Sequence, residues 1–135
     1  MSDEVTGGDT VSVLVVDDQA PFRFAARAVI KRADGFELVG EAESGEQAVD
    51  LAAELHPDLV LMDINMPVMD GYEATRRIKQ QQGHWGLPVI FISANSEISA
   101  LEQAFQAGGC DYVSKPFHQL EVLARVQNQL RLREL

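Results

Sequence analysis

The chain has 135 residues, of which 46% are hydrophobic and 24% are charged, and its net charge is −10 at pH 7. This composition is typical of one soluble globular domain that can bury a core without disulfide bonds. The acidic balance argues against a nucleic-acid-binding surface, and no apolar run is long enough to span a membrane. The N-terminus does not resemble a signal peptide and the single cysteine, Cys110, fits a reducing compartment, so we expect a cytoplasmic protein.

Apolar runs alternate with segments of helical apolar spacing after a polar stretch, residues 1–10, which we expect to be a flexible tail. Residues 11–135 are then expected to form one domain, in which the last turns of the final helix are either packed on the sheet or the start of a linker. The expected elements, in chain order, are strand 12–16, helix 21–32, strand 36–40, helix 44–55, strand 59–62, helix 70–81, strand 88–92, helix 96–107, strand 111–114 and helix 117–133.

Residues at the helix ends support these limits. Ser44 with Gln47 three positions later forms a capping-box pattern, and Asp70 is a typical N-cap residue. Ser96 is expected to cap the next helix, and Gly108 to end it in the left-handed conformation. Strands that alternate with helices predict right-handed crossovers and a parallel sheet covered on both faces, which is a doubly wound α/β fold.

Polar side chains follow four of the predicted strands. Asp17 and Asp18 follow the first strand, Asp63 follows the third, Ser93 follows the fourth and Lys115 follows the fifth. Ligands of such a sheet bind at the carboxyl ends of the strands, where the strand order reverses. We therefore expect three carboxylates, a hydroxyl and an ammonium group to converge at one edge.

Three neighbouring carboxylates repel one another, and a hard divalent cation such as Mg²⁺ removes that conflict. One carboxylate is then free to attack a phosphoryl group, whose transfer needs positioning and charge neutralisation. The pattern thus predicts an aspartyl-phosphate site. For Asp17 and Asp18 a second reading stays open, because either could cap the helix that begins near Pro21, whereas no helix begins directly after Asp63.

Four stretches carry a family pattern, namely VLVVDDQ, DLVLMDINMPVMDGYE, PVIFISA and AGGCDYVSKPF. In this order they resemble the response-regulator receiver domains of bacterial two-component systems, and the resemblance extends from about residue 12 to the final helix. It implies the chemotaxis-regulator fold, which is flavodoxin-like and has five parallel strands in the order 2-1-3-4-5 with five helices.

The resemblance also implies a metal site. Asp63 matches the aspartate that is phosphorylated and that ligates Mg²⁺. Asp18 matches a direct Mg²⁺ ligand, and Asp17 matches an acidic residue that acts through water or a hydrogen bond. The backbone carbonyl of Asn65 matches the third protein ligand.

Four further residues match the family's switch. Lys115 matches the lysine that pairs with the phosphoryl oxygens, and Pro116 the cis-proline that aims it inward. Ser93 stands where a hydroxyl moves to bond the phosphoryl group. Tyr112 matches the aromatic residue that turns inward when the hydroxyl moves.

The implied function is a signalling switch that receives a phosphoryl group from a sensor histidine kinase or a phosphotransfer protein. Such a domain is not an enzyme in the conventional sense, although it takes part in its own phosphorylation and dephosphorylation. Phosphorylation changes the surface made by helix 96–107, strand 111–114 and helix 117–133, through which receivers bind an output domain or a second copy. No direct contact with nucleic acid or membrane is expected.

Several alternatives are weaker or remain open. A receiver-like module with a dead site disagrees with the intact acidic, hydroxyl and lysine positions. A phosphatase of external substrates usually carries D-x-D, whereas Asp63 is followed by Ile64 and Asn65. A flavin site disagrees with DDQAP, which places carboxylates where phosphate would bind. A stand-alone receiver and one joined to an output module are equally compatible with the sequence.

The remaining reactive side chains are interpreted without a chemical role. His56, His84 and His118 are far apart in sequence and are expected on the surface. Trp85 is expected to anchor a loop, and Cys110 to be a small packed residue rather than a redox sensor.

Overall fold

The computed structural model describes residues 10–94, 98–115 and 118–133. Its elements, in chain order, are β1 (Val11–Val16), α2 (Ala20–Arg32), β2 (Phe36–Ala42), α3 (Gly45–Leu55), β3 (Leu59–Asp63), α4 (Gly71–Lys79), β4 (Val89–Ser93), α5 (Ile98–Gln106), β5 (Asp111–Ser114) and α6 (Gln119–Arg133). The expected tail, Ser96 and Pro116 lie outside the described residues, except that Thr10 at the end of the tail is included.

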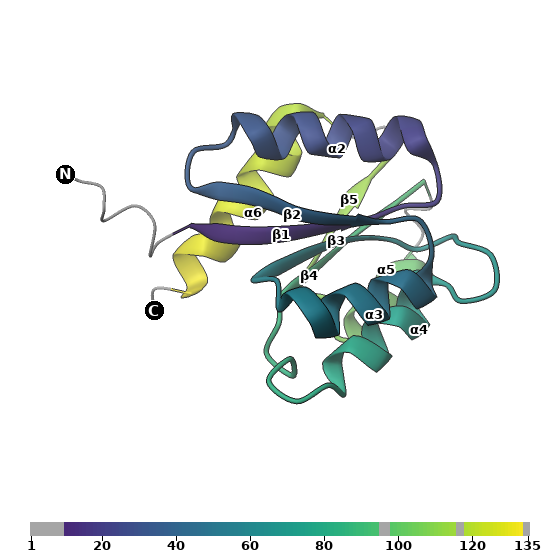
Figure 1. The fold of residues 1–135 in the computed structure, drawn as a ribbon. Helices are drawn as coiled ribbons and strands as arrows, with labels where there is room; N and C mark the ends of the chain where they lie inside the picture. Colours follow the sequence, from purple (N-terminus) through teal and green to yellow (C-terminus); the bar gives the residue numbers. More distant parts are fainter. Residues whose placement is uncertain (1–9, 95–97, 116–117, 134–135) are drawn as a thin grey trace.

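The five strands form one parallel sheet in the order β2-β1-β3-β4-β5, which confirms the doubly wound α/β fold (Figure 1). The strand order reverses between β1 and β3, because the chain moves outward to β2 and then returns past β1. The carboxyl ends of these two strands are therefore where a ligand site is expected.

Helices cover both faces of the sheet. Helices α2 and α6 lie on one face, and α3, α4 and α5 lie on the other (Figure 1). Alternate side chains of β1 enter the two cores: Val13 and Val15 pack toward α2 and α6, whereas Leu14 and Val16 pack toward the other three helices. The continuous apolar runs of the central strands thus serve two cores at once. No helix within the described ranges is long and apolar enough to cross a membrane.

The predicted helix caps at Ser44 and Asp70 are present, whereas the one predicted at Ser96 lies outside the described residues. The Ser44 hydroxyl accepts a hydrogen bond from the Gln47 backbone N–H at 3.1 Å, and the Asp70 carboxylate accepts one from the Glu73 N–H at 2.9 Å. Gly108 follows α5 with a φ of 107°, as expected for a left-handed helix end.

The structure corrects several limits. Asp63 and Ser93 are the last residues of β3 and β4 rather than the residues after them, so the sheet itself positions both side chains. Helix α4 ends at Lys79, two residues before the predicted end. Phe105 and Leu120 occupy apolar positions in the helical spacing of α5 and α6, where burial is expected, but their exposed fractions are 55% and 75%.

Candidate functional site

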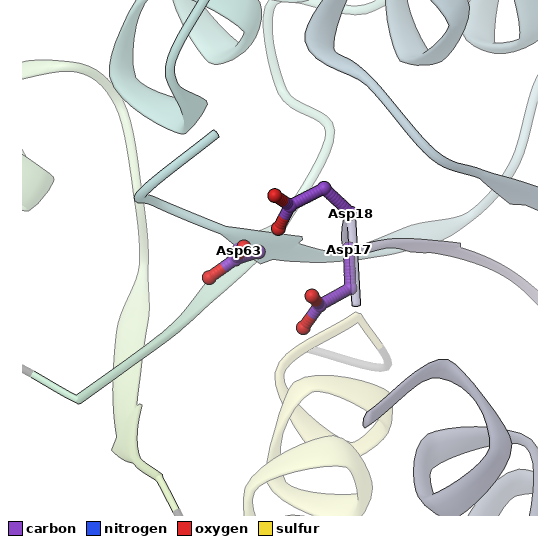
Figure 2. A group of neighbouring side chains, drawn as sticks. All are labelled: Asp17, Asp18 and Asp63. Atoms are coloured by element: carbon purple, nitrogen blue, oxygen red, sulfur yellow. The ribbon is translucent and has the colours of Figure 1, made fainter. Parts of the chain in front are cut away.

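Three carboxylates meet where β1 and β3 end (Figure 2). Val16 of β1 is paired with Met62 of β3, so Asp17 and Asp63 follow this pair on adjacent strands. One carboxylate oxygen from each of Asp17, Asp18 and Asp63 lies within 4.8 Å of the others. Asp17 and Asp63 are buried, whereas Asp18 is exposed, so the cluster is open to solvent on the Asp18 side.

Lys115, the residue that follows β5, adds an ammonium group to the carboxylate cluster. Its Nζ lies 2.9 Å from Oδ2 of Asp17 and donates to Oδ1 of Asp63 at 3.1 Å. The side chain of Lys115 is 8% exposed, so both ion pairs are shielded from water. The backbone N–H of Lys115 donates to the Ser93 carbonyl oxygen at 2.8 Å, which fixes the start of the side chain at the end of β4.

The charges at this edge do not balance. Burial and, second, the adjacent charge of Asp17 raise the pKa of Asp63 to about 7, although the hydrogen bond and charge of Lys115 oppose the rise. One ammonium group is thus insufficient for two buried carboxylates and a third beside them. The oxygen-only donor set and the shortage of positive charge fit a hard divalent cation such as Mg²⁺.

The loop after β1 does not support the reading of Asp17 as a helix cap. Oδ1 of Asp17 accepts from the backbone N–H of Gln19 at 2.9 Å, and Gln19 precedes the helix. Nη1 of Arg23 donates to the Asp17 carbonyl oxygen at 2.8 Å. These contacts hold the loop and leave Oδ2 of Asp17 for Lys115.

The loop after β3 is held against the strand end by Gly71. The Gly71 N–H donates to the Ile64 carbonyl oxygen at 2.8 Å. A Cβ at Gly71 would collide with the backbone carbonyl oxygen of Asp63, so the close approach requires glycine. Asn65 in this loop is exposed, and its Nδ2 lies 3.5 Å from the Ser93 hydroxyl.

Of the two expected switch residues, Ser93 is the last residue of β4 and Tyr112 lies in β5. Ser93 is 1% exposed and Tyr112 is 9% exposed, so the Tyr112 ring is directed inward. The Tyr112 hydroxyl is buried and finds no hydrogen-bond partner among the described residues.

Several contacts were missed by the sequence reasoning. The Phe22 ring faces the Lys115 ammonium, with 4.1 Å between Nζ and the ring centroid. His56 and His84 are not isolated surface residues: Nδ1 of His56 lies 3.3 Å from Nε2 of the buried His84. The spacing of 28 positions gives no signal for this contact, which arises because the C-cap of α3 lies beside the loop before β4.

Two other interpretations are corrected. Trp85 is 82% exposed and so does not anchor its loop by burial. Cys110 is exposed rather than packed. Partial burial of its thiol nevertheless raises the Cys110 pKa, which disfavours the reactive thiolate. His118 is exposed, as expected.

Comparisons with known proteins agree with this fold. The model of the response regulator receiver domain family matches residues 13–127. The chemotaxis protein CheY of Bacillus subtilis is 42% identical over 118 residues, which cover 87% of this chain and 96% of that protein. A protein-glutamate methylesterase/protein-glutamine glutaminase of Methanococcoides burtonii is 34% identical over 122 residues, but the match spans 34% of its length.

A similar solved structure is the receiver domain of the sensor histidine kinase PA1611 of Pseudomonas aeruginosa, which has a magnesium ion coordinated in its active-site cleft. It is 32% identical with a TM-score of 0.81, and the match covers 90% of this chain and 98% of that one. The chain therefore belongs to the response regulator receiver domain family, whose members are phosphorylation-dependent switches of two-component signalling.

Proposed function

We propose that Asp63 accepts a phosphoryl group from a phosphohistidine of a partner kinase or phosphotransfer protein, in a reaction that depends on Mg²⁺. One observation carries this assignment. Asp63 is a buried carboxylate at the strand-order reversal, beside two further carboxylates and 3.1 Å from the Lys115 ammonium. Of the three carboxylates, it is the one that ends a central strand of the sheet.

Asp18, Asp63 and the backbone carbonyl of Asn65 would hold the metal, with Asp17 acting through water or a hydrogen bond. Bound there, Mg²⁺ would neutralise the carboxylates and the phosphoryl oxygens. The raised pKa of Asp63 supports this requirement, because a protonated carboxyl group is a poor nucleophile and added positive charge favours the ionised form.

The chemical step exchanges one bond to phosphorus for another. An oxygen of Asp63 forms the new P–O bond while the P–N bond to the donor imidazole breaks, and the imidazole keeps the electron pair and takes up a proton. Lys115 would pair with the phosphoryl oxygens, since its ammonium already contacts the accepting carboxylate. The domain thus takes part in its own phosphorylation without turning over an external substrate.

The same site would control a surface. Ser93 is buried at the end of β4, where its hydroxyl would bond the phosphoryl group, and Tyr112 on the neighbouring strand would follow. The equilibrium between conformations of the surface made by α5, β5 and α6 would then shift, and this surface would bind an output domain or a second copy.

The test is labelling by the small phosphodonor phosphoramidate, with Asp63→Asn and Asp50→Asn as matched variants. Asp50 lies exposed on α3, so its substitution removes one carboxylate outside the cluster. We expect the wild type and the Asp50 variant to be labelled in Mg²⁺, and labelling to be lost in the Asp63 variant and in wild type treated with EDTA. Undiminished labelling of Asp63→Asn would refute the assignment.

A further inference from the structure

The Lys115 ammonium has an aromatic neighbour that the proposed chemistry does not use. Its Nζ contacts Asp17 at 2.9 Å and Asp63 at 3.1 Å, and lies 4.1 Å from the centroid of the Phe22 ring. The Gln19 Oε1 is at 3.5 Å, the outer limit of a hydrogen bond. Two carboxylates and one aromatic face therefore surround the ammonium closely.

Phe22 is well placed to hold a cation. It lies in the first turn of α2, directly after the loop that Asp17 orders through the Gln19 N–H. The face of an aromatic ring carries partial negative charge, and its attraction for a cation is strongest when the pair is removed from water. Lys115 meets this condition because its side chain is 8% exposed.

The contact matters because the carboxylates cannot serve two cations equally. A divalent cation held by Asp18 and Asp63, with Asp17 acting through water or a hydrogen bond, would draw on the carboxylate charge that now holds Lys115. This weakens both ion pairs. The Phe22 ring is uncharged and ligates no hard cation, so its attraction for the ammonium does not depend on those carboxylates. It can keep the ammonium beside Asp63 when the carboxylates are engaged.

We propose that Phe22 is a positioning residue that holds the Lys115 ammonium at the acceptor carboxylate through a cation–π contact. The proposal rests on the proposed function, in which Lys115 pairs with the incoming phosphoryl oxygens. Phe22 also packs in the first turn of α2, so the experiment must separate the charge distribution of the ring from its bulk.

A first readout is independent of phosphorylation. In the wild type, the ring current of Phe22 shifts the proton resonances of the Lys115 ε-methylene group away from those of exposed lysines. Phe22→Leu abolishes this shift, whereas Phe24→Leu leaves it unchanged. Phe24 is the matched control, because it lies on the same helix and its ring faces Arg27 at 5.8 Å. A Lys115 resonance that is the same in wild type and Phe22→Leu overturns the contact.

The second readout is the rate of labelling by phosphoramidate in saturating Mg²⁺. Phe22→Leu is expected to slow labelling by about tenfold, and Phe22→Tyr or Phe22→Trp to stay within about twofold of wild type, since both keep an aromatic face. Phenylalanines with one, two and three ring fluorines at position 22 keep the shape of the side chain but withdraw charge from the ring face. The logarithm of the rate is expected to fall stepwise along this series.

The same fluorinated series at Phe24 is expected to leave the rate unchanged. If the wild type is labelled at Asp63 but the labelling rate is constant along the fluorinated series at position 22, the positioning role is overturned and the proposed function stays intact. A wild type that takes up no phosphoryl group at all overturns the proposed function and this role with it.

Discussion

At the scale of single residues, the site holds more carboxylates than positively charged groups. Lys115 lies between Asp17 and Asp63, and its single ammonium faces two buried carboxylates, with Asp18 beside them. The pKa of Asp63 is raised to about 7 mainly by burial and secondly by Asp17. A carboxyl group whose pKa is raised in the folded state destabilises the fold when it ionises. The carboxylate cluster is therefore destabilising when no cation neutralises it.

This imbalance predicts a pH-dependent effect of Asp63→Asn on stability. Because the folded-state pKa of Asp63 is raised, the contribution of this residue to the free energy of unfolding is fully present below about pH 4. That contribution is lost as the pH rises through about 7. Without divalent cations, the variant should therefore be more stable than wild type at pH 8, by on the order of 1–3 kcal/mol, and the difference should shrink at pH 5.

Urea unfolding at the two pH values measures this difference, with Asp50→Asn as a control that is expected to be neutral. Added Mg²⁺ should stabilise the wild type more than Asp63→Asn, since binding to the folded state alone raises the free energy of unfolding. An Asp63→Asn variant less stable than wild type at pH 8 would show that the carboxylate is not strained in the folded state.

At the scale of elements, the ends of β3 and α4 meet through one glycine. The Gly71 N–H donates to Ile64, and there is no room for a Cβ beside the Asp63 carbonyl. The Asp70 cap begins α4 at the same point, so the start of α4 and the end of the strand that carries Asp63 are packed together. A change at Gly71 should therefore affect both stability and the site.

Gly71→Ala is expected to destabilise the fold by about 1–3 kcal/mol, because the added methyl group must push backbone aside. Labelling of Asp63 should slow as the carbonyl and the following loop move. Gly86→Ala is the matched control, since a Cβ there meets nothing within 4 Å. Denaturant unfolding and phosphoramidate labelling of both variants measure the effects, and equal stability of the two would contradict the close approach.

At the scale of the whole molecule, the sequence predicts the architecture better than the surface. Apolar runs and helical spacing identify the ten elements found within the described residues, and the carboxyl-end rule places Asp17, Asp18, Asp63 and Lys115 together. The strand order came from the family pattern, because periodicity says nothing about which strands are neighbours.

What the sequence could not predict has physical causes. Helical apolar spacing does not show where the buried face ends, and Leu120, which fits the spacing of α6, is 75% exposed. Contacts such as that between His56 and His84 join segments far apart in sequence, and neither residue type marks the other. The Phe22 contact was hidden for another reason: a phenylalanine at a helical apolar position looks like ordinary packing.

The chemical identity of the phosphorylated residue decides whether Asp63 is the phosphoacceptor. Wild-type protein treated with phosphoramidate and Mg²⁺ is reduced with borohydride, which converts an aspartyl phosphate to homoserine, and the converted residue is located by peptide mass spectrometry. We expect homoserine at position 63, dependent on Mg²⁺. Homoserine at Asp17 or Asp18 instead, or no conversion in the presence of Mg²⁺, would contradict this assignment.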